Sequence, residues 1–265
     1  YAFYQFDDEE YPTEPIPPDK FLDALSNVIS KLDLYKSLKK GTFLYRVRIH
    51  DKKEHLKEVT QLGPPKRDKA YYSNRMSPAG IPMFYGAFDI GTAIKETYCG
   101  DITLTVTTTF NDSSEMGTAK RQTYSDDIAT IAKFKLLKDI TLVDLSKIPK
   151  IPGFFEDVNY SYHEITFLND FMTDISKGID KDSCEHIEYV PTQIITEHLR
   201  YLHHRKHDNE EIYGIIYPSS KNKGKNSVVV FCENEHCVEK QKANNESFFE
   251  LESARRCNPK KYTDT

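Results

Sequence analysis

Hydrophobic residues recur along this chain with two spacings, one typical of helices and one typical of strands. In residues 21–38 they recur every three or four positions, which predicts a helix that Gly41 ends. Residues 42–49 alternate well enough for a strand, with Arg46 and Arg48 on one face. Short apolar runs predict further strands at 83–88, 102–110, 128–137, 140–145, 212–217, 227–231 and 248–251. Helical patterns follow at 90–98, 160–176 and 191–204.

Polar segments separate these elements. Residues 1–19 are acidic and rich in proline, which predicts a linker or an extended packing arm. Residues 50–73 form a long, charged segment, and we expect a surface loop or lid there. Residues 111–127 form a polar insertion, and the tail from Arg255 onward is polar. Because strands outnumber helices and do not alternate regularly with them, the pattern favours an α+β fold over a doubly wound sheet.

Residues 74–96 concentrate chemically useful side chains in one predicted loop–strand–helix unit. Prolines and a glycine shape the loop, and Asp89 is placed to cap the helix that follows the strand. Arg75 then lies on the loop, Tyr85 on the strand, and Glu96 about two turns into the helix, at about 1.5 Å per residue. This arrangement indicates a functional site.

Composition narrows the classes of protein. The 265 residues allow one large domain, or one domain plus a small appendage. The net charge of −5 argues against binding of nucleic acid. No apolar stretch is long enough for a membrane span, so we expect no membrane association. Five scattered cysteines do not resemble a disulfide framework, which favours the cytoplasm. Because the chain begins with Tyr1 rather than methionine, we expect a fragment boundary or a processed end there.

Six ordered sequence blocks give the chain a resemblance to a known family. They are LYRVR at 44–48, LGPP at 62–65, NRMSPAGIPMFYGA at 74–87, TAIKE at 92–96, EYVPTQ at 188–193 and GIIYPS at 214–219. In these blocks the chain resembles RES-domain proteins, named for an arginine, a glutamate and a serine. The resemblance divides the chain into an N-terminal linker and helix, 1–41, and a RES domain, 42–265, with an enlarged middle section, 97–185.

The resemblance implies a fold similar to the ADP-ribosyltransferase toxins, with a mixed β core flanked by helices. It also implies cleavage of the nicotinamide–ribose bond of NAD⁺, by an NAD glycohydrolase or an NAD phosphorylase. Such proteins are mostly bacterial toxins or defence enzymes, so a cognate antitoxin or a regulatory domain or protein is the expected partner. NAD⁺ would be the substrate, with no further cofactor, and a homodimer is left open.

Carried over residue by residue, the family's arginine, glutamate and serine fall on Arg75, Glu96 and Ser219. The family's binding arginine and aromatic residue fall on Arg46 and Tyr85. Glu96 would stabilise the positive charge that develops on the ribose. The arginines would bind the pyrophosphate through paired donors, and Tyr85 would stack on the nicotinamide.

Other residues complete the predicted site. We expect Glu96, Arg75 and Tyr85 to be catalytic, while substrate-binding roles fall on Arg46, Ser219, Arg48, Gln193 and Asn226. Each has a plainer alternative. For example, Arg48 could be a simple exposed side chain, and the amides of Gln193 and Asn226 could be structural. We expect no metal, although the histidines near the end of the 191–204 helix and the group Cys232, His236 and Cys237 have loosely compatible spacing.

Two other functions remain compatible with these residues. One is a protein ADP-ribosyltransferase that uses the same site and transfers ADP-ribose to a protein. The other is a non-catalytic module that senses NAD or ADP-ribose.

Overall fold

Nine strands form a single sheet in the described part of the chain. The computed structural model describes residues 17–98, 128–150, 162–176, 189–203 and 211–262. The strands are β1 (Tyr35–Leu38), β2 (Phe43–His50), β3 (Phe84–Ala87), β4 (Ile128–Leu136), β5 (Ile140–Asp144), β6 (Ile212–Pro218), β7 (Asn226–Val230), β8 (Cys237–Glu239) and β9 (Phe249–Cys257). Their order across the sheet is β1-β5-β6-β7-β3-β2-β4-β9-β8.

Four α-helices of eight residues or more accompany this sheet in the described residues. They are α1 (Pro18–Lys31), α3 (Ile90–Thr97), α4 (Tyr162–Ser176) and α6 (Val190–Tyr201). Shorter turns of helix are α2 (Val59–Leu62), η1 (Arg67–Lys69), η2 (Leu145–Lys147), η4 (Asn234–His236) and η5 (Pro259–Tyr262). In this part of the chain, no helix has the length and apolar character to cross a membrane.

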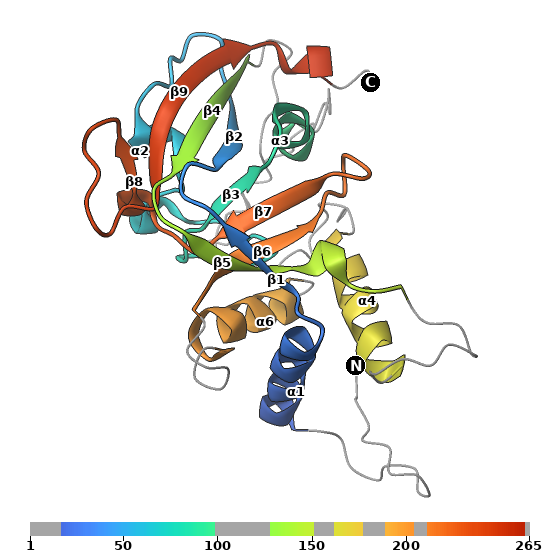
Figure 1. Ribbon diagram of the computed structural model, residues 1–265. Helices are drawn as coiled ribbons and strands as arrows, with labels where there is room; N and C mark the ends of the chain where they lie inside the picture. The colour runs from blue at the N-terminus through green and yellow to red at the C-terminus, as the bar shows by residue number, and fades with distance from the viewer. Residues whose placement is uncertain (1–16, 99–127, 151–161, 177–188, 204–210, 263–265) are drawn as a thin grey trace, which may run out of the picture.

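The sheet is mixed, which confirms the predicted α+β class. The pairs β5–β6 and β8–β9 are parallel, and the other neighbouring strands are antiparallel. Figure 1 shows α1, α4 and α6 gathered beside β5 and β6, while α3 lies beside β2 and β3. A mixed β core flanked by helices is therefore present, as the resemblance to RES-domain proteins implied.

Three hydrophobic clusters hold these elements together. One packs α1, α4 and α6 against β5, β6 and β7, with Ile29, Phe171 and Leu199 among its buried members. A second packs α3 against β2 and β4. The third buries the other side of the strands around Phe84, which stacks on Phe249 at 4.4 Å between ring centroids. The candidate site lies where α3 and the β6–β7 turn meet.

The predicted helix over 21–38 is wrong in its last part. Helix α1 ends at Lys31, and Asp33 adopts a left-handed backbone with φ 48. That turn redirects the chain, so residues 35–38 form β1 and pair antiparallel with β5. The apolar residues of this segment fit the spacing of a helix as well as that of a strand. Only the pairing with β5 decides for the strand.

The segment 50–73 is also more ordered than predicted. Its middle forms α2 and η1, and Val59 and Leu62 are buried in the core cluster around Phe84. The expectation of a surface loop or lid is therefore wrong for α2, whereas η1 is exposed on the surface. Asn234 supports it by donating from its amide to the carbonyls of Thr60 and Pro64, at 3.1 and 2.6 Å.

The C-terminal strand is longer than the apolar run at 248–251 predicted. Strand β9 continues through Arg255 to Cys257 because it pairs with β4 along nearly its whole length. Strand β8 was not predicted, while the remaining described strands and longer helices agree with the predictions within a few residues. The predicted strand at 102–110 and the polar insertion at 111–127 lie outside the described residues.

Candidate active site

The loop that carries Arg75 is fixed to helix α6. Thr192 donates a short hydrogen bond to the backbone carbonyl of Arg75. The amide of Gln193 donates to Ser73 Oγ at 2.7 Å and to the carbonyl of Asn74 at 2.8 Å. These three bonds place Arg75 through its backbone, so the loop position depends on α6.

Tyr85 lies on β3 and its hydroxyl is turned toward the same loop. The hydroxyls of Tyr85 and Ser77 are 3.0 Å apart. Burial raises the pKa of Tyr85 to about 12, although the hydrogen bond with Ser77 opposes the shift. Tyr85 is therefore protonated near neutral pH, and its hydroxyl joins strand β3 to the loop that carries Arg75.

Glu96 lies on α3, which begins as the sequence predicts. Asp89 caps the helix, because its carboxylate accepts the backbone N–H of Thr92 at 2.8 Å. Glu96 is then placed near the last turn, where its Oε1 accepts a 2.5 Å hydrogen bond from Ser219. The structure thus joins two sequence blocks that are 123 residues apart.

The surroundings of Ser219 determine where its single proton points. Ser219 is 7% exposed and follows β6 directly. Its Oγ accepts the backbone N–H groups of Asn222 at 2.9 Å and Lys221 at 3.3 Å. Because a hydroxyl has two lone pairs and one proton, both acceptor positions are used and the proton is donated to Glu96. Ser219 therefore orients the Glu96 carboxylate.

Tyr217 is a further site residue that the sequence did not single out. It lies on β6, paired across the sheet with Ser227. Burial raises its pKa far above the usual value, the charge of Glu96 and then Tyr85 raise it further, and Arg75 opposes the shift. The charges of all three predicted catalytic residues therefore act on one partly buried tyrosine. The GIIYPS block contains Tyr217, but nothing in its spacing marked it.

Arg46 and Arg48 are directed to the other side of β2. They alternate with the residues that face α3, and the Arg46 guanidinium lies 5.6 Å from the centre of the Phe84 ring. Arg46 Nη1 donates to the carbonyl of Tyr85 at 2.7 Å, and Arg48 Nη2 donates to the carbonyl of Gly63 at 2.6 Å. Burial lowers the pKa of Arg46. The structure does not place either guanidinium beside Glu96, and their substrate-binding roles stay predictions.

The two predicted amides make hydrogen bonds to the protein. Gln193 bonds the Arg75 loop, as described above. Asn226 opens β7 opposite Pro218, and its amide donates to Ser146 Oγ at 2.9 Å. Asn226 thus lies at the same end of the β6–β7 hairpin as Ser219 but is bonded to η2.

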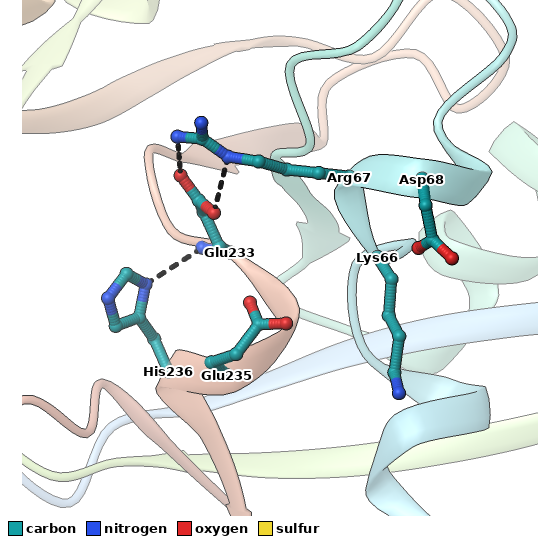
Figure 2. A pocket seen from close by; sticks show the side chains of 6 residues that line it. All are labelled: Lys66, Arg67, Asp68, Glu233, Glu235 and His236. Carbon is teal, nitrogen blue, oxygen red and sulfur yellow. Dashed lines mark hydrogen bonds and ion pairs between the residues drawn. The ribbon is translucent and has the colours of Figure 1, made fainter.

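A polar surface hollow lies between η1 and η4. Figure 2 shows Arg67 facing Glu233 there through two hydrogen bonds, of 2.9 and 2.5 Å. These bonds lower the pKa of Glu233. The hollow is lined by Lys66, Arg67, Asp68, Glu233, Glu235 and His236. It contains none of the predicted site residues, and its ion pair connects the middle of segment 50–73 to the chain after β7.

No group of three or more His, Cys, Asp or Glu side chains suited to a metal ion occurs within the described ranges. Cys232 and Cys237 are buried free thiols there, and His236 Nδ1 accepts the backbone N–H of Glu233 at 2.9 Å.

Comparison with known proteins places the chain in a family. The model of the RES domain matches residues 43–250, and the chain belongs to the RES-domain family. No curated protein and no solved structure matches the chain. The match begins at β2 and ends within β9, so it includes Arg75, Tyr85, Glu96, Tyr217 and Ser219.

Proposed function

We propose that this protein breaks the bond between nicotinamide and ribose in NAD⁺, with the reaction centred on Glu96. The observation that carries the proposal is the hydrogen bond from Ser219 to Glu96. It joins the glutamate and the serine after which the family is named, in a chain that the family model matches over residues 43–250. A carboxylate held in one orientation by a buried donor is suited to stabilise a cation that forms beside it.

The chemistry needs a negative charge near the ribose more than it needs an acid. Nicotinamide in NAD⁺ is already a cationic leaving group and departs as a neutral molecule. The ribose then carries positive charge in an oxocarbenium-like transition state, as in glycoside hydrolysis. Because Ser219 directs its proton to Oε1, that oxygen is fixed as an acceptor. Glu96 can then stabilise the ribose cation or orient the attacking group.

Arg75 and the tyrosines have supporting roles in this proposal. Arg75 would bind the pyrophosphate of NAD⁺ with its planar, two-pronged guanidinium. Tyr85 and Tyr217 are partly buried and protonated near neutral pH. Their rings would form the apolar wall against which the nicotinamide packs. Ser77, which bonds Tyr85, keeps that wall attached to the Arg75 loop.

The acceptor of the ADP-ribose unit is decided by product analysis. Purified protein is incubated with NAD⁺ with and without phosphate, and the products are separated by chromatography. A glycohydrolase would release nicotinamide in both cases, with ADP-ribose as the second product, whereas a phosphorylase would release nicotinamide only with phosphate. A phosphorylated ADP-ribose that forms only with phosphate would identify a phosphorylase.

Two outcomes would contradict the proposal in different ways. Label from adenine-labelled NAD⁺ that stays on a macromolecule of a cell extract would identify a protein ADP-ribosyltransferase. NAD⁺ that binds in calorimetry and stays intact would identify a sensing module. A toxin role, and an antitoxin or regulatory protein as partner, rest on the family resemblance and belong to the proposal.

A further inference from the structure

The turn between β6 and β7 contacts α3 at two points. Ser219 at the start of the turn donates to Glu96, and Asn222 three residues later donates from its side-chain amide to Thr92 Oγ1 at 2.8 Å. Thr92 and Glu96 are four residues apart on α3, so their side chains lie on the same face of the helix. The second contact therefore fixes the turn directly beside the first.

The contact at Thr92 has a defined direction. Thr92 is fully buried, and its hydroxyl donates its proton to Asp89 Oδ2 at 2.7 Å. The hydroxyl can then only accept a hydrogen bond from Asn222. Asp89 in turn receives the backbone N–H of Thr92 as the helix cap. A chain of hydrogen bonds runs from the cap of α3 through Thr92 to Asn222.

Asn222 is also bonded to the serine that orients the glutamate. Its backbone N–H donates to Ser219 Oγ at 2.9 Å. Asn222 thus fixes the turn to α3 with its side chain and occupies a lone pair of Ser219 with its backbone. If the side-chain contact is lost, the backbone N–H is less firmly placed, and the Ser219 proton is no longer confined to the direction of Glu96.

We propose that Asn222 and Thr92 are positioning residues of the candidate site, which hold the β6–β7 turn so that Ser219 orients Glu96. The proposal rests on the proposed function in one respect: it takes Glu96 as the reacting carboxylate. Neither side chain needs to touch the substrate. Their loss should therefore change the rate of the chemical step more than the affinity for NAD⁺.

Four substitutions test the proposal. Asn222→Ala removes the side-chain donor, and Thr92→Val keeps the shape of threonine while removing the hydroxyl. Thr92→Ser keeps the hydroxyl and serves as the rescue. Thr97→Val is the matched control on the same helix, because the Thr97 hydroxyl donates only to the carbonyl of Ala93, one turn back.

The first readout is the kinetics of nicotinamide release. We expect Asn222→Ala and Thr92→Val to lower kcat by about 10- to 100-fold with KM changed by less than about threefold, as for a misplaced catalytic group. Thr92→Ser and Thr97→Val should stay close to wild type. If Asn222→Ala has wild-type kcat while the wild type cleaves NAD⁺, the positioning roles are wrong and the proposed function stands.

The second readout does not depend on activity. Amide hydrogen exchange at Asn222 reports whether its N–H stays bonded to Ser219. We expect exchange about tenfold faster in Thr92→Val than in wild type, and unchanged in Thr97→Val. Unchanged exchange in Thr92→Val overturns the positioning proposal. A wild type that leaves NAD⁺ intact instead overturns the proposed function, and the exchange data still decide whether Thr92 and Asn222 hold the turn.

Discussion

Replacement of Gln193 by alanine separates two roles that this residue could have. The sequence suggests a substrate-binding amide, whereas the structure shows both of its amide bonds directed at the Arg75 loop. If the bonds hold the loop, Gln193→Ala should weaken both the fold and the placement of Arg75. If the amide served only the substrate, the fold would keep its stability.

The size of the effect follows from these two bonds. Gln193 is 8% exposed, and a typical net hydrogen bond contributes about 0.5 to 1.5 kcal/mol. Asn74 is exposed, so water can replace part of the lost bond to its carbonyl. We therefore expect a loss of about 1 to 2 kcal/mol in the free energy of unfolding. In a chain of this size each kcal/mol lowers the melting temperature by about 2 to 4 °C.

Thermal unfolding and kinetics together test this prediction. Gln193→Ala should lower the melting temperature and raise the KM for NAD⁺. Gln193→Glu, which keeps the length of the side chain but cannot donate, should lose at least as much stability. Ile194→Ala, at the next position and 51% exposed, is the control and should change the melting temperature less. An unchanged melting temperature in both Gln193 variants, with a raised KM, would refute the structural role.

Three further predictions concern the fold around the site. The folded-state pKa of Tyr85, about 12, lies above the unfolded value of 10.0, so its contribution to stability is complete below pH 10 and is lost as the pH rises toward 12. Wild type should lose about 2 to 3 kcal/mol more than Tyr85→Phe over that range, as denaturant titrations would show; parallel curves would contradict this. Phe84→Ala should cost about 3 to 5 kcal/mol in the same titration because Phe84 is fully buried against Phe249, and a loss below about 1 kcal/mol would contradict the packing. Gly214→Ala should prevent stable folding, seen as loss of a cooperative thermal transition, because the added Cβ would clash with the Val229 carbonyl; a normal transition would refute the close approach of β6 and β7.

Local sequence signals predicted the centre of the molecule well. The apolar run at 83–88 and the cap at Asp89 gave β3 and α3 with the observed capping bond. These elements obey short-range rules, since a helix cap and a short apolar run depend on residues a few positions apart. These short-range rules were sufficient to place Tyr85 on a strand and Glu96 on a helix, whatever the rest of the fold.

Long-range pairing decided the parts that the sequence did not predict. Residues 35–38 form a strand because β5 lies beside them, and the polar residues around Arg255 are in β9 because β4 pairs with them. The burial of Leu62 likewise depends on contacts with distant strands. None of these partners is adjacent in the sequence, so periodicity alone could not find them.

In the candidate site, too, the sequence indicated the residues while the folded chain determined their contacts. The family resemblance named Glu96 and Ser219, while their hydrogen bond is a property of the folded chain. Thr92 could have been noticed from its spacing of four residues from Glu96. Its bond to Asn222 requires the β6–β7 turn to reach α3, and no sequence rule predicts that contact.

The most direct test of the account is nicotinamide release from NAD⁺ by wild type and by Glu96→Gln, measured side by side. Glutamine keeps the size of the side chain and can still accept a hydrogen bond from Ser219, but it removes the negative charge. We expect wild type to release nicotinamide, Glu96→Gln to be at least about 100-fold slower, and both to melt at similar temperatures. Equal rates for the two proteins, or no release by wild type, would contradict this expectation.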